Sequence, residues 1–116
     1  MPPTRPAVPS SHRDLDPLLL LPVRLFVMCL LADLHWHEAV VLANTLRIKP
    51  RSVSLHAELL AAAGYVSIRV AGRRTKMRLT PLGLDRLTGH VTALQKVAST
   101  AALLVTTRHG APRSPT

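Results

Sequence analysis

Hydrophobic positions change their spacing along the chain, and these changes divide it into predicted elements. From Pro22 to Leu34 apolar residues recur every three or four positions, which is typical of a helix. The same spacing predicts two shorter helices, over residues 38–46 and about 51–63. Pro50 suits the first turn of the second of these, where a backbone N–H has no helical partner. Gly64 is suited to end it in a left-handed conformation.

The hydrophobic period then shortens to two. Apolar and polar side chains alternate on both sides of the segment Ala71-Gly72-Arg73-Arg74, which predicts a β-hairpin over residues 66–79. Thr80-Pro81 is a typical helix start, and apolar residues follow it at heptad spacing over residues 84–105. The chain is therefore predicted to be mainly α, with a small β-hairpin and a long C-terminal helix.

The two ends of the chain differ from its centre. Residues 1–13 contain four prolines and are predicted to be a disordered arm, and residues 110–116 a disordered tail. Residues 14–109 are predicted to form one folded domain, with a helix start at Asp16-Pro17. A chain of 116 residues with 47% hydrophobic residues has the length and apolar content for one such domain.

The helix predicted from Pro22 is apolar on all sides and needs cover on more than one face. It is too short to span a membrane and contains Arg24, so no membrane contact is expected. In so short a chain, a second subunit would supply part of the cover. We therefore expect a homodimer, whose dimerisation contacts lie on the seam of the last helix: Leu84, Leu87, Val91 and Leu94.

Positive charge is concentrated in the second half of the chain. The net charge is +9, and residues 69–78 alone hold five basic side chains and no acidic one. Such a patch attracts nucleic acid first and an anionic membrane surface second, and a merely solvated loop is the remaining interpretation.

Two short helices joined by a tight turn, followed by a basic hairpin, suit double-stranded DNA. The second helix of such a pair can enter the major groove, while the hairpin contacts flanking DNA. The groove-facing candidates on the second helix include Glu58, and His56 is placed either against a phosphate or in helix packing. The predicted DNA-binding residues are Arg51, Ser52, Ser54, Leu55, His56, Arg73, Arg74 and Lys76.

Other chemistry finds little support in the sequence. The single cysteine, Cys29, cannot form an internal disulfide, and we expect it to be an inert core residue. We expect the protein to be cytoplasmic and associated with the nucleoid. His35 and His37 lack further ligands, so neither a metal nor another cofactor is expected. His90 is expected on the surface. There is no nucleophile–base pair, phosphate-binding glycine loop or carboxylate pair, so no enzyme is predicted.

Several short motifs follow one another at a particular spacing: Asp16-Pro17, Pro22-Val23-Arg24-Leu25, Ser54-x-His56, Ala63-Gly64-Tyr65-Val66, Gly72-Arg73-Arg74 and Arg78-Leu79-Thr80-Pro81-x-Gly83. In this combination the chain resembles the winged helix-turn-helix transcriptional regulators, in the compact branch related to the MarR and ArsR families. The resemblance covers about residues 15–96.

This resemblance implies a homodimer on a near-palindromic operator, usually as a repressor. Residues 51–63 would be the recognition helix in the major groove, and residues 66–79 the wing. The alternative is a protein–protein interaction module on the same scaffold, because a fold does not determine a function. The sequence does not identify a small-molecule effector.

Overall fold

The computed structural model describes residues 10–109, and residues 1–9 and 110–116 lie outside it. Two short 3-10 helices open the described part, followed by four α-helices and three strands. Their bounds are η1 Ser10–Asp14, η2 Pro17–Leu19, α1 Pro22–Leu30, β1 His37–Glu38, α2 Ala39–Leu46, α3 Pro50–Ala62, β2 Val66–Ala71, β3 Arg74–Leu79 and α4 Pro81–His109.

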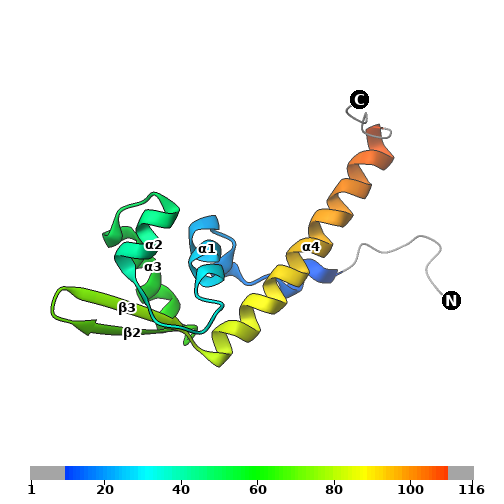
Figure 1. Ribbon diagram of the computed structural model, residues 1–116. Coiled ribbons are helices and arrows are strands. Elements are labelled where there is room, and N and C mark those ends of the chain that lie inside the picture. Colours follow the sequence, from blue (N-terminus) through cyan, green and yellow to red (C-terminus); the bar gives the residue numbers. More distant parts are fainter. Residues whose placement is uncertain (1–9, 110–116) are drawn as a thin grey trace.

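Helices α2 and α3 pack against a small sheet, α1 packs on α2 and α3, and α4 leads away from the sheet toward the C-terminal end (Figure 1). The predicted mainly α fold with a basic hairpin and a long last helix is confirmed. The core is aliphatic, as the scarcity of aromatic residues requires. Its fully buried side chains include Leu19, Val27, Met28, Leu31, Val53, Leu60 and Met77.

The sheet is antiparallel with strand order β1-β3-β2. The predicted hairpin is present: Val66 pairs with Leu79, and the pairing continues to Ala71 opposite Arg74. Gly72 has a φ of 60° at the first position of the two-residue loop, where a type II′ turn requires glycine. The two-residue strand β1 was not predicted. His37 and Glu38 pair with Met77 and Lys76, in a stretch too short for any periodicity.

The predicted end of α3 and start of α4 are both confirmed, and they meet. Gly64 has a φ of 83°, and the Tyr65 N–H donates to the Leu60 carbonyl, which closes α3. The Thr80 hydroxyl oxygen accepts from the Gly83 N–H at 3.0 Å, as a helix cap does, and the same hydroxyl donates to the Gly64 carbonyl at 2.6 Å. One threonine thus joins the end of one helix to the start of the next.

The N-terminal part of the fold differs from one sequence prediction and agrees with another. Residues 10–13, assigned to a disordered arm, lie in η1, which packs against α4. The rest of that arm and the tail lie outside the described residues. Asp16 does cap a helix, since its carboxylate accepts from the Leu18 N–H at 2.9 Å, but η2 is a single 3-10 turn.

Helix α1 is not covered on all sides by its own chain. Val27 and Met28 are buried, whereas Phe26 is 51% exposed. Cys29 is exposed as well, so its predicted core position is wrong: it lies on the side of α1 turned away from the buried pair. Partial burial nevertheless raises the pKa of the Cys29 thiol, and this keeps the reactive thiolate fraction low.

Candidate nucleic-acid interface

The turn between α2 and α3 is held by a backbone hydrogen bond and a strained residue. Arg47 has a φ of 56°, in the left-handed region that residues other than glycine, asparagine and aspartate seldom adopt. This conformation lets the Ile48 N–H reach back to the Ala43 carbonyl at 3.1 Å. Pro50 then begins α3 in the position predicted for it. The side chains of Arg47, Lys49 and Arg51 are all exposed at this turn.

Helix α3 has a buried face and an exposed face. Val53, Ala57 and Leu60, spaced four and three residues apart, are completely buried. On the opposite face Arg51, Leu55 and Glu58 are exposed, while Ser52 and Ser54 lie half-buried on the flanks. Arg51, near the N-terminal end of this helix, is therefore accessible to a ligand in the position where helix-turn-helix proteins contact bases.

His56 does not share the exposed face of α3. It is half-buried, and its Nδ1 accepts a hydrogen bond of 3.3 Å from Nε of Arg24 on α1. Burial, and then the positive charge of Arg24, lower the pKa of His56. Of the two roles left open by the sequence, this geometry favours packing between α1 and α3.

The wing carries the other predicted contacts. Arg73 and Arg74 are exposed at its tip, and Lys76 lies half-buried further along β3. Arg74 Nε lies 3.6 Å from the Glu38 carboxylate, an exposed ion pair that contributes little to stability. A feature that sequence reasoning missed lies beside them: the guanidinium carbons of Arg69 and Arg78 lie 4.6 and 4.7 Å from the centroid of the Trp36 ring.

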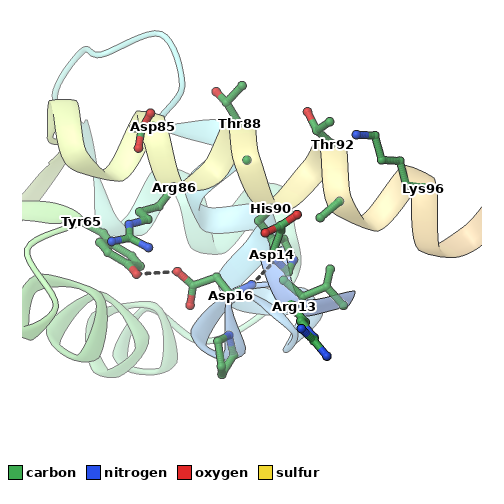
Figure 2. Close-up of a pocket in the computed structure, with 14 residues that line it drawn as sticks. Arg13, Asp14, Asp16, Tyr65, Asp85, Arg86, Thr88, His90, Thr92 and Lys96 are labelled. Carbon is green, nitrogen blue, oxygen red and sulfur yellow. Dashed lines mark hydrogen bonds between the residues drawn. The ribbon is translucent and has the colours of Figure 1, made fainter. Parts of the chain in front are cut away.

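A polar network ties the N-terminal segment to the rest of the fold (Figure 2). The Tyr65 hydroxyl donates to the Asp16 carboxylate, and the Asp16 backbone N–H donates to His90 Nδ1 at 2.9 Å. Burial, followed by the hydrogen bond to Asp16 and its charge, raises the pKa of Tyr65. These residues line a surface pocket of about 710 Å³ between the N-terminal segment and α4.

His90 is thus misplaced by the sequence prediction, which put it on the surface. It is 1% exposed, and its Nε2 has no hydrogen-bond partner among the described residues. Because Nδ1 accepts a hydrogen bond, the ring proton lies on Nε2 in the neutral form. Local spacing on α4 could not reveal this burial, since the cover comes from a segment 74 residues earlier in the chain.

The predicted dimerisation seam divides into two halves. Leu87 is 5% exposed and belongs to the core of its own chain, and Leu84 and Val91 pack against that core. Leu94, at 37% exposed, begins the accessible half. Beyond it the helix α4 extends away from the body of the domain (Figure 1), and its apolar side chains Leu103, Leu104 and Val105 are exposed. Of the four predicted dimerisation residues, only Leu94 is therefore exposed to a partner.

The histidine pair near β1 contacts a carboxylate. His37 Nε2 lies 2.9 Å from the Asp33 carboxylate, and the His35 N–H donates to the same carboxylate at 2.9 Å. The hydrogen bond from His35, then that from His37, lower the pKa of Asp33. Within residues 10–109 no three histidine, cysteine or carboxylate side chains lie close enough together to hold a metal ion. No helix in the same range combines the length and apolar character needed to cross a membrane.

Comparison with known proteins agrees with this geometry. A regulator homologue from Pyrococcus horikoshii OT3 has a TM-score of 0.65 and 24% identity, over 72% of this chain and 87% of that one. YusO from Bacillus subtilis has a TM-score of 0.63 and 20% identity, over 82% of this chain and 66% of its own. BpsR from Bordetella bronchiseptica, whose DNA binding is described as regulated by 6-hydroxynicotinic acid, has a TM-score of 0.61 and 20% identity, over 84% and 83%.

These identities, all below 25%, establish the shared fold, and no curated protein matches the chain significantly. A family model described as a winged helix DNA-binding domain matches residues 23–98. That range contains α1 apart from Pro22, all of α2, α3 and the wing, and α4 as far as residue 98, and it covers most of the chain. The predicted resemblance to winged helix-turn-helix regulators is confirmed. The chain belongs to the winged helix DNA-binding domain family.

Proposed function

We propose that this protein is a sequence-specific DNA-binding transcriptional regulator that acts as a homodimer, as a repressor in the cytoplasm, and carries no catalytic activity. The observation that carries the proposal is the exposed face of α3, which presents Arg51, in a fold that also has a wing with a basic tip. In this arrangement α3 enters the major groove and the wing contacts flanking phosphates. Repression is assigned because regulators of the family it resembles usually repress.

The test begins with genome-wide mapping of the binding sites of the tagged protein. The sequence bound most often is then used in a gel shift with purified protein, against a scrambled duplex of the same composition. The proposal expects one shared sequence motif with two half-sites related by approximate symmetry. Mapped sites without a common motif would contradict sequence-specific regulation.

A protein-docking role for the same scaffold is supported by one observation. The exposed face of α3 contains the apolar residues Leu55 and Leu59, and the nearby α2 exposes Val40 and Val41. Exposed apolar groups can mark a protein interface. Under this second candidate, the Arg51→Ala variant would bind DNA as the natural protein does, whereas substitutions of Leu55 would abolish capture of a protein partner.

The homodimer is proposed to form through the exposed half of α4. Leu94, Ala98, Ala101 and Val105 lie on one face of this helix at heptad spacing, and all four are exposed. Leu103 lies on the opposite face of the same helix and is 66% exposed. The two faces therefore provide a test and its matched control within one exposed segment.

Replacing both Leu94 and Val105 with glutamate is expected to convert the dimer to monomers, because four like charges would be placed in one apolar contact. The measurement is sedimentation velocity across a concentration series. Leu103→Glu should leave the dimer intact. A natural protein that remains monomeric at tens of micromolar, as an order of magnitude for a weak dimer, would contradict the proposed interface.

Arg47 is proposed as a further phosphate contact at the turn before α3. Its left-handed backbone is the conformation that glycine adopts without a steric penalty. We expect Arg47→Gly to raise the free energy of unfolding by about 0.5–1 kcal/mol, the relief of the left-handed strain less the entropy cost of glycine. The same variant should weaken DNA binding.

Arg47→Lys is the control for this prediction, because it keeps both the positive charge and the backbone strain. It should keep most of the affinity at unchanged stability. Chemical denaturation and fluorescence anisotropy with labelled duplex give the two quantities. A glycine variant that is more stable and binds DNA with unchanged affinity would exclude Arg47 from the interface.

A further inference from the structure

The outer face of the sheet is strongly basic. The strand register places Arg69 opposite Lys76, Ser67 opposite Arg78 and Ala71 opposite Arg74, with all six side chains on the same face. The inner face instead carries the buried residues Val66, Met77 and Leu79, which pack in the core beneath α2 and α3. Four cations thus share the side of the sheet that the helices leave uncovered.

This crowding of cations is unfavourable for the free protein. Arg69 and Lys76 are a directly opposed like-charge pair, an arrangement that destabilises a sheet. Glu38 is paired in register with Lys76 and forms an ion pair with Arg74. Among residues 10–109, no carboxylate forms an ion pair with Arg69 or Arg78. A partner rich in negative charge would remove the repulsion.

Trp36 holds the two unpaired arginines. Both guanidinium groups lie within cation–π distance of its half-buried indole, at 4.6 and 4.7 Å from the ring centroid. The attraction of the ring for each cation offsets the repulsion between them and restricts their side chains. Stacking uses the flat face of a guanidinium, so its N–H groups remain available to bind the oxygen atoms of an anion.

We propose that Trp36 is a positioning residue of the DNA interface, which holds Arg69 and Arg78 on the outer face of the sheet for contact with the phosphate backbone. This inference rests on the proposed function and extends the wing contact from its tip to its base. Every second position of β3 carries a cation, Arg74, Lys76 and Arg78, about 6.7 Å apart, and Arg73 lies in the turn next to Arg74. A linear row of cations suits a linear polyanion better than it suits a compact acidic ligand.

The chain has a single tryptophan, so its fluorescence reports on this face alone. Titration of the full chain with a duplex of about 20 base pairs should change Trp36 emission saturably, in parallel with the anisotropy of labelled duplex. The Arg69→Ala/Arg78→Ala variant keeps Trp36 and should lose most of this emission change. The logarithm of the binding constant falls linearly with the logarithm of the salt concentration, and the variant should make this slope shallower by about two units. That is close to one unit for each phosphate group that the variant no longer neutralises.

Variants of Trp36 separate positioning from simple packing. Trp36→Leu keeps apolar volume but removes the ring, and should weaken binding to operator and random duplex alike, roughly three- to tenfold. Trp36→Phe restores an aromatic face and should recover part of the lost affinity. Both variants should keep the fold. Lys96→Ala removes an exposed charge from α4 and is the control for the change in net charge. It should leave the change in Trp36 emission on duplex binding as it is in the natural protein.

Three outcomes would overturn the inference, and they differ in what they leave standing. If the natural protein binds duplex while both the double arginine variant and Trp36→Leu match it in affinity and salt slope, the inference fails and the proposed function stands. If Trp36 emission responds to polyglutamate but not to duplex, the face docks an acidic protein instead. If the natural protein binds no duplex at all, both the proposed function and this inference fail.

Discussion

Replacing Gly83 with alanine is expected to lower the melting temperature of the protein by roughly 8–16 °C. A β-carbon at this position would overlap the backbone carbonyl group of Tyr65 and press on the Leu79 side chain. Gly83 is buried at the start of α4, where Thr80 fixes its backbone through a hydrogen bond. The helix therefore cannot move away without losing its cap.

The size of this effect follows from two opposing contributions. Forcing extra volume against a fixed backbone costs about 3 kcal/mol, the upper part of the range for overpacked sites. Alanine recovers about 1 kcal/mol of helix propensity relative to glycine. The net loss is about 2 kcal/mol, which in a domain of this size corresponds to the stated change in melting temperature.

Gly89 provides the matched control, since it lies in the same helix and a β-carbon there would meet nothing within 4 Å. Gly89→Ala should therefore raise the melting temperature by a few degrees. Thermal unfolding followed by circular dichroism measures both variants. If the two substitutions change the melting temperature equally, α4 does not approach the Tyr65 backbone closely enough to exclude a β-carbon at Gly83.

The second large effect is expected at Arg51. Arg51→Ala should reduce the preference for operator over scrambled duplex roughly 5- to 150-fold, the equivalent of one bidentate arginine–guanine contact. Arg51 is exposed at the second residue of α3, on the face opposite the buried Val53. Its removal leaves the core intact, so stability should change little.

The wing supplies the contrast to Arg51. Arg73→Ala/Arg74→Ala should weaken operator and scrambled duplex to a similar degree, because charge contacts to phosphates carry no sequence information. The log–log salt slope should fall by about two units. Anisotropy titrations of both duplexes across a salt series measure each quantity. An Arg51→Ala variant that retains full preference would favour the protein-docking alternative.

Local sequence signals predicted most of the fold because each rests on chemistry within a few residues. The cap at Thr80, the left-handed Gly64 and the alternation on either side of Gly72 all correspond to observed features. Strand β1 was not predicted because two residues are too few to show an alternating hydrophobic pattern. Its pairing with β3 is a contact between segments distant in the sequence.

The candidate site was predictable only in part, for the same physical reason. The exposed face of α3 follows from helical spacing, so Arg51 and Leu55 could be placed from the sequence. Spacing cannot say whether an apolar row faces its own core or a partner, and Leu87 lies in the core. The burial of His90 and the stacking on Trp36 both depend on segments distant in the sequence.

The central claim is that this chain recognises a particular DNA sequence. The most direct measurement is the ratio of dissociation constants of the natural protein for its most frequently mapped site and for a scrambled duplex, near physiological salt. The account predicts a ratio of about 1,000 or more, as specific regulators show. Equal affinity for the two duplexes would contradict it.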